Sequence, residues 1–85
     1  MAEENTNSPS GDGREVLRHK QRTAIVVHRL KPLPDGTCEL WRVTERPGTP
    51  PASAKVGAFP DEAQAMGEAQ KIKRRLEGDG WQEVK

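Results

Sequence analysis

Three side chains in the sequence have the chemistry of a nucleophile, a general base or a metal ligand: Cys38, His19 and His28. Cys38 stands between Thr37 and Glu39 in a run typical of a strand, where a lone cysteine is usually a small buried apolar residue. No acidic residue stands at a spacing that would orient either imidazole as a base or a ligand. Because a set of nucleophile, base and orienting residue is missing, we expect a protein that is not an enzyme.

The same inventory excludes the common cofactors. A single cysteine provides neither a CxxC pair nor a Cys/His metal spacing, and the eight glycines form neither a P-loop nor a GxGxxG motif. The opening MAEENTNSPSGDG has no basic head and no apolar run, and no stretch of the chain is apolar enough to span a membrane. We therefore predict a cytoplasmic protein with no cofactor, no metal and no membrane contact.

Charge is unevenly distributed along a chain whose formal net charge is only +1. Residues 1–13 carry three acidic side chains, whereas residues 14–31 carry six Lys and Arg against one Glu. This contrast is typical of a basic arm that contacts nucleic acid, and it is equally typical of ordinary solubilising charge. The low net charge favours the second interpretation. The candidate nucleic-acid-binding residues are Arg18, Lys20, Arg22, Arg29 and Arg42.

Hydrophobic patterning predicts an α+β fold, in which a small three-stranded antiparallel sheet is packed by one C-terminal helix. Runs rich in β-branched and apolar residues place the strands at residues 23–30, 37–44 and 54–59. The turn LPDG joins the first two strands, and WQEV is a candidate fourth short strand. We expect residues 21–85 to form this single domain and residues 1–20 to be a disordered or weakly structured tail. Within that tail, REVLRHKQR fits either a short helix or a frayed lead into the first strand.

The helix is the best marked element. Asp61 can cap its N-terminus, and Gln64 can complete a D-x-x-Q capping box. Gly78 is placed to end the helix at the C′ position, and Gly67, which costs the helix about 1 kcal/mol relative to Ala, is expected to mark a close approach to a strand. The residues that share one stripe, predicted to lie across the sheet, are Ala65, Met66, Ala69, Ile72, Lys73 and Leu76.

The strands carry apolar side chains on both faces, and one helix can cover only one face. We therefore expect an apolar patch on the other face, which usually belongs to a dimer or to a partner surface. The first prediction is a small non-catalytic interaction module that binds a protein partner or self-associates through its sheet face. The alternative is a nucleic-acid-binding protein that uses the sheet face and the basic arm. The predicted partner-binding residues are Val26, Leu30, Trp41 and Val43.

Two family resemblances involve the segment that begins with VGAF, residues 56–59. That strand, the Ala-rich helix after it, and Gly80, Trp81 and Val84 resemble one β-α-β half of a SPOR domain, a family that binds peptidoglycan strands; the other half is absent. Separately, the strands and helix over residues 23–77 are similar to the arm-binding domains of phage integrases and to plant AP2 domains, which lay their sheet in the DNA major groove. The residues for which this second resemblance implies DNA contact are Arg29, Trp41, Arg42 and Lys55.

Overall fold

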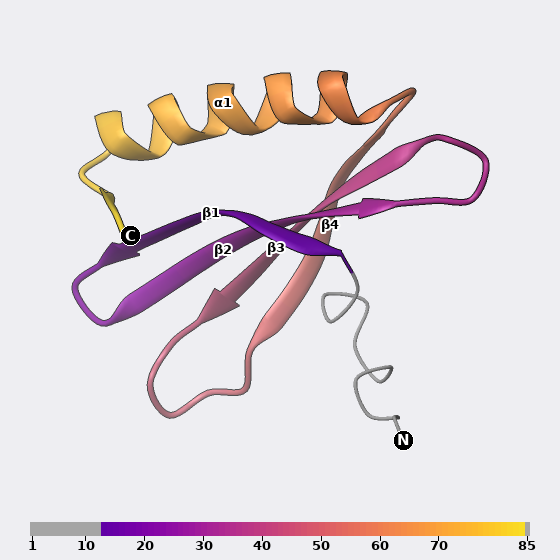
Figure 1. The fold of residues 1–85 in the computed structure, drawn as a ribbon. Coiled ribbons are helices and arrows are strands. Elements are labelled where there is room, and N and C mark those ends of the chain that lie inside the picture. The colour runs from indigo at the N-terminus through magenta and orange to yellow at the C-terminus, as the bar shows by residue number, and fades with distance from the viewer. Residues whose placement is uncertain (1–12, 85) are drawn as a thin grey trace.

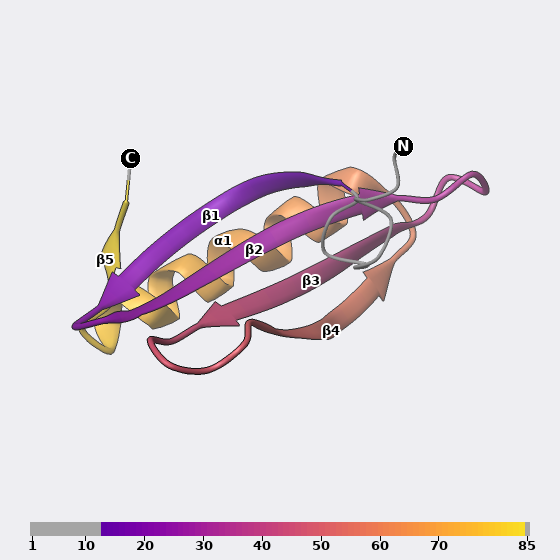
Figure 2. The ribbon, with the colours of Figure 1, turned by 90° about the horizontal axis from the view of Figure 1, so that it is seen from below.

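The structure is a computed structural model that describes residues 13–84 of the chain. Figures 1 and 2 show one helix lying across one face of a five-stranded sheet. The predicted class, an antiparallel sheet packed by one C-terminal helix, is confirmed, although the sheet has more strands than predicted. The part of the predicted tail at residues 1–12 lies outside the described residues. In chain order the elements are β1 (Arg14–Gln21), β2 (Ala24–Pro32), β3 (Cys38–Glu45), β4 (Ala52–Phe59), α1 (Glu62–Gly78) and β5 (Gln82–Glu83).

The strands lie in the order β4-β3-β2-β1-β5. From β1 to β4 each strand pairs with the next in the antiparallel sense, so these four form a meander. The short β5, which comes from the WQEV segment, pairs with the outer edge of β1 opposite His19 and Lys20. The chain that follows α1 therefore returns to the end of the sheet where β1 turns into β2.

Residues 14–20, which the sequence places in a weakly structured tail, form most of β1, so the domain boundary expected at residue 20 is corrected. Leu17 and His19 both point inward from this strand and are buried, but only Leu17 is apolar. A bulge between Glu15 and Leu17 adds an extra residue, Val16, beside Leu17. The buried histidine and the bulge together hide the alternation by which a strand is recognised.

The hydrophobic core lies between α1 and the sheet. The stripe predicted from helical spacing is confirmed, because Ala65, Ala69 and Ile72 are buried there and Met66 and Leu76 pack at its margin. Two alanines in this stripe allow the helix backbone to approach the strands closely. The sheet contributes the buried side chains Leu17, Leu30, Cys38 and Leu40.

The predicted N-terminus of the helix is also confirmed. The backbone N–H of Gln64 donates to Asp61 Oδ1 at 2.9 Å, which satisfies one of the free amides of the first turn. Gly67, in contrast, does not mark a close approach. A Cβ built at this position would meet no atom within 4 Å, so that expectation was wrong.

The C-terminus of α1 differs from the expectation, because Gly78 is still helical and Gly80 takes the left-handed conformation, with φ +97°. The N–H of Gly80 donates to the carbonyl of Glu77 at 3.2 Å, and the N–H of Trp81 donates to the carbonyl of Leu76 at 3.0 Å. These two bonds form a Schellman motif with Gly80 at C′. The motif reverses the chain direction and fixes where Trp81 leaves the helix.

Candidate functional site

The four predicted partner-binding residues do not share one surface. Val26 and Leu30, 5% and 0% exposed, point to the face of the sheet that α1 covers, whereas Trp41 and Val43 point to the other face. The apolar patch expected on that other face is not present in the described part of the chain. Among residues 13–84, Val56 on the edge strand β4 is the single exposed large apolar side chain, at 37%.

The uncovered face is closed by its own long side chains. Val27 and Val43 stand opposite each other on β2 and β3, and they are buried although no helix or strand of the described chain lies over them. Register places Arg18 beside Val27, and Trp41 precedes Val43 on the same face. Side chains of this length cover apolar surface with their stems while their polar ends remain in water. The Trp41 indole N–H is also engaged, since it donates to Glu39 Oε1 at 2.9 Å.

Two of the predicted nucleic-acid-binding residues on this face already have partners. Arg18 donates two hydrogen bonds to the Glu15 carboxylate, at 2.9 and 3.0 Å. Arg29 donates to the backbone carbonyl of Gly13 at 2.9 Å. A ligand on the sheet face would have to compete with these bonds. Lys20, which is exposed at the end of β1, has no such restraint among the described residues.

The chemistry-bearing side chains lie beneath α1, away from the surface. His19, His28 and Cys38 are 0%, 0% and 1% exposed. His19 Nε2 lies 3.1 Å from Glu77 Oε2, and Arg42 Nε donates to His28 Nε2 at 3.0 Å, so the predicted nucleic-acid contact Arg42 is turned to the helix side.

Burial shifts the pKa values of two of these groups, His28 and Cys38. Burial, and secondly the charge of Arg42, lowers the pKa of His28 to about 4, which keeps this imidazole neutral near pH 7. Burial also raises the pKa of the Cys38 thiol above its ordinary value. Within residues 13–84, no three His, Cys, Asp or Glu side chains are grouped so that they could hold a metal ion.

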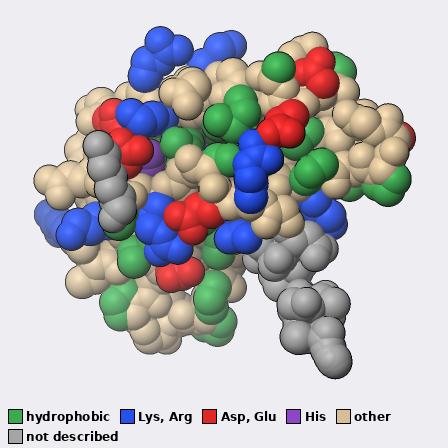
Figure 3. All heavy atoms as spheres, viewed as in Figure 1, with side chains coloured by type: hydrophobic (Ala, Val, Ile, Leu, Met, Phe, Trp, Pro, Cys, Tyr) green, Lys and Arg blue, Asp and Glu red, His purple; other side chains and the backbone are tan. Residues whose placement is uncertain are grey.

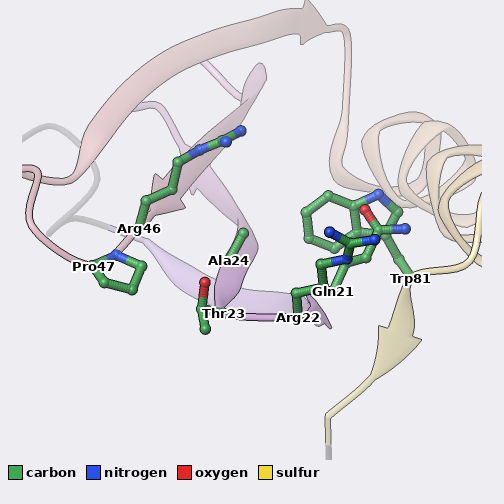
Figure 4. A pocket seen from close by; sticks show the side chains of 7 residues that line it. All are labelled: Gln21, Arg22, Thr23, Ala24, Arg46, Pro47 and Trp81. Atoms are coloured by element: carbon green, nitrogen blue, oxygen red, sulfur yellow. The ribbon is translucent and has the colours of Figure 1, made fainter.

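A cavity of about 420 Å³ opens where the β1–β2 turn, the β3–β4 loop and the chain after α1 meet. Its size lies within the range of small-molecule sites, about 300–1,000 Å³. In Figure 4, Arg46 and Pro47 lie on one side and Arg22 and Trp81 on the other. The lining residues are Gln21, Arg22, Thr23, Ala24, Arg46, Pro47 and Trp81. We call this the turn cavity.

Arg22 has the most unusual backbone in the described chain. It is the first of two residues that connect the paired Gln21 and Ala24, and its φ of +57° is the only positive value for a non-glycine residue between positions 13 and 84. The left-handed conformation costs an L-residue roughly 1–2 kcal/mol, and turns of this length usually place Gly, Asn or Asp there. Strained residues of this kind are concentrated at functional sites.

The two arginines of the turn cavity are free to meet a ligand, because neither the Arg22 nor the Arg46 side chain makes a hydrogen bond or ion pair within the described chain. The segments around them, residues 20–25, 45–47 and 69–84, carry seven Lys and Arg against four Asp and Glu. In the rest of the described chain the two kinds are equal, six against six. Figure 3 shows Lys and Arg side chains on the side of α1 that faces away from the sheet. Four of these seven cations are on α1; of the other three, Arg22 and Arg46 line the turn cavity and Lys20 lies on the adjoining end of β1.

Trp81 forms a wall of the turn cavity, and hydrogen bonds hold the chain on both sides of it. The Gln21 side chain donates to the carbonyl of Asp79 at 3.0 Å, and the N–H of Val84 donates to the carbonyl of Arg18 at 2.8 Å. The sequence places Trp81 in the candidate fourth strand WQEV and does not single out Arg46. Only the return of the chain to β1 brings these two residues to one site, and no local sequence signal announces it.

Comparison of the chain with protein-family models, with curated proteins and with solved structures gives no match. The resemblances to SPOR, integrase arm-binding and AP2 domains therefore gain no support from these comparisons. Within residues 13–84, no helix has both the length and the apolar character needed to cross a membrane.

Proposed function

We propose that the protein is a small non-catalytic module that binds a nucleic-acid strand through the turn cavity. The observation that carries the proposal is that Arg22 and Arg46 line one cavity and are both unpaired within the described chain. Arginine is suited to this task because its planar guanidinium can donate two parallel hydrogen bonds to a phosphate.

The charge distribution supports the same ligand class. Phosphate contacts supply most of the affinity of a non-specific nucleic-acid binder, and such contacts need a local cationic surface more than a high net charge. Arg22 and Arg46 line the turn cavity and Lys20 lies nearby on β1, so this end of the sheet has a local cationic surface although the chain is almost neutral overall. Lys20 and Arg22, predicted from the sequence, belong to this end, and Arg46 is added to them.

A non-catalytic role is favoured by where the reactive groups lie. His19, His28 and Cys38 are buried beneath α1, and none of them lines the turn cavity. The cavity itself offers donors and an aromatic ring, which can bind an anion, but it offers no carboxylate, imidazole or thiol that could transfer a proton or attack a substrate.

The test is fluorescence anisotropy with a short labelled oligonucleotide, measured between about 50 and 200 mM salt. We expect binding whose affinity falls steeply with salt, and a loss of at least about tenfold for each arginine removed in Arg22→Ala and Arg46→Ala. The matched control is the double variant Arg14→Ala/Lys55→Ala, which removes two cations whose partners are Glu62 and Glu39.

The double variant Arg22→Ala/Arg46→Ala should also reduce the slope of log affinity against log salt, by about 0.7 for each lost phosphate contact to a single strand. The proposal fails if the wild-type protein binds no oligonucleotide at low salt. It also fails if the control variant loses as much affinity as the cavity variant does, because binding would then follow total charge and not the turn cavity.

The second candidate function is the binding of a protein partner or of a second copy of the chain. The cytoplasmic location expected from the sequence stays a prediction. Partner binding is favoured by β4, which stands at the edge of the sheet and carries the exposed Val56. Edge strands can pair with a strand of another chain. Sedimentation at rising concentration would then reveal a dimer that Val56→Lys abolishes. A protein that remains monomeric and purifies without a partner would remove this candidate.

A further inference from the structure

We propose that the turn cavity selects single-stranded over duplex nucleic acid, by stacking one unpaired base on Trp81 while Arg22 and Arg46 hold the neighbouring phosphate. This inference rests on the proposed function and adds to it the structural class of the ligand.

The Trp81 ring lies outside the hydrophobic core. A tryptophan in a small domain usually belongs to the core, but Trp81 is neither a member of the core cluster nor one of the partly buried apolar side chains packed against it. Its side chain is half-buried and forms a wall of the turn cavity (Figure 4). The aromatic surface is therefore directed to a place that a ligand can reach.

The chain on both sides of Trp81 is held by hydrogen bonds. The Schellman motif at Gly80 fixes the chain before Trp81, and pairing of β5 with β1 fixes the chain after it. Gln21 adds a side-chain bond to the Asp79 carbonyl at 3.0 Å. A ring held from both sides loses little conformational entropy when a flat ligand stacks on it, which favours affinity.

Two kinds of group meet in the turn cavity. Unpaired guanidinium groups beside an accessible aromatic ring match the two parts of a nucleotide, a phosphate and a planar base. In a duplex both faces of each base are covered by its neighbours, so only a single strand can present a base to Trp81. DNA and RNA share this chemistry. Because stacking uses the flat face that every base has, we expect binding that tolerates sequence.

The experiment compares four ligands with one protein: single-stranded DNA, single-stranded RNA, the corresponding duplex, and an abasic strand of equal length. We expect both single strands to bind more tightly than the duplex and the abasic strand. Trp81→Leu should weaken binding of the base-containing strands by about 10-fold to 100-fold and leave the abasic strand unaffected, whereas Trp81→Phe should retain most of the affinity. The ratio of DNA to RNA affinity identifies which source of strand is preferred.

A second measurement does not depend on the stability of the Trp81 variants. In Trp41→Phe protein, Trp81 is the only tryptophan, and its fluorescence should be quenched when a base-containing strand is added and unchanged with the abasic strand. Binding without quenching overturns the stacking proposal.

The outcomes separate this inference from the proposed function. If Trp81→Leu weakens the abasic and base-containing strands equally, or if the duplex binds more tightly than the single strand, the stacking inference is overturned and phosphate binding at the turn cavity stands. If the wild-type protein binds none of the four ligands at low salt, the proposed function itself is overturned, and the inference with it.

Discussion

Acid should destabilise the protein through His28, and the effect can be calculated from its surroundings. The imidazole is fully buried beneath α1 and accepts a hydrogen bond from Arg42, so it is held neutral in the folded state. Its pKa falls from 6.5 to about 4, chiefly because of burial. In the unfolded chain the same group takes up a proton near pH 6.5. Since the unfolded state binds more protons, stability is complete above pH 6.5 and is lost as the pH falls toward 4.

The magnitude follows from 1.36 kcal/mol for each unit of pKa difference. Between pH 7 and pH 4.5, linkage gives a loss of about 2 kcal/mol from this one group, which is roughly 10 °C in the melting temperature of a domain of this size. The carboxylates whose pKa is lowered, among them Glu39 and Glu77, titrate mostly below this range. The window from pH 6.5 to 4.5 therefore reports mainly on His28.

Urea denaturation at several pH values measures the effect, and His28→Gln is the control, because the amide can still accept from Arg42 but cannot titrate. The free energy of unfolding of the variant should fall less steeply with pH than that of the wild-type protein, by about 1 kcal/mol per pH unit. Equal slopes for the two proteins, or an NMR titration of the His28 ring with a midpoint near 6.5, would refute the reasoning.

Three further substitutions test features of the fold and the site. Arg22→Gly should stabilise the domain by roughly 0.5–1 kcal/mol in thermal unfolding, because it relieves the strain of φ +57° at some cost in chain entropy, while it weakens oligonucleotide binding; a destabilised variant would show that the turn is not strained. Asp61→Ala should cost about 1 kcal/mol in urea denaturation through loss of the cap bond to the Gln64 N–H, and Asp61→Asn should restore most of it; no change in the alanine variant would contradict this. Gly80→Ala should lower the free energy of unfolding by roughly 1–3 kcal/mol, since φ is +97° and the new Cβ would lie 3.1 Å from Gln21 Nε2. An unchanged melting temperature would show that alanine takes this position in the Schellman motif without strain.

The helix could be predicted from the sequence because its signals are local. The Asp61 cap, the Gln64 position and the spacing of the apolar stripe all lie within a few turns of one another. At the C-terminus of the helix, both Gly78 and Gly80 are candidates for the C′ position. Which of them takes it depends on where the chain must turn to reach β1, and this is Gly80. β1 could not be recognised from the sequence because one of its inward residues is a histidine, and a histidine does not fit the pattern of alternating apolar residues.

The surface was harder to predict than the fold. The alternation of β2 and β3 correctly indicates apolar residues on both faces, but it does not show that arginine, tryptophan and other long side chains seal the second face. Arg46 and Trp81 belong to separate segments that meet only after the sheet and helix are assembled. The turn cavity therefore depends on tertiary structure, and only its Arg22 was among the predicted residues.

The shortness of β5 has a consequence for the motions of the molecule. This strand has two residues, and it connects the segment of Trp81 to the rest of the sheet. Releasing so few backbone bonds requires much less free energy than unfolding the meander, so β5 should detach from β1 transiently while the Schellman motif before Trp81 stays formed. Hydrogen–deuterium exchange should therefore be far faster at the amide of Val84 than at the amides shared by β2 and β3, and a bound strand should slow it.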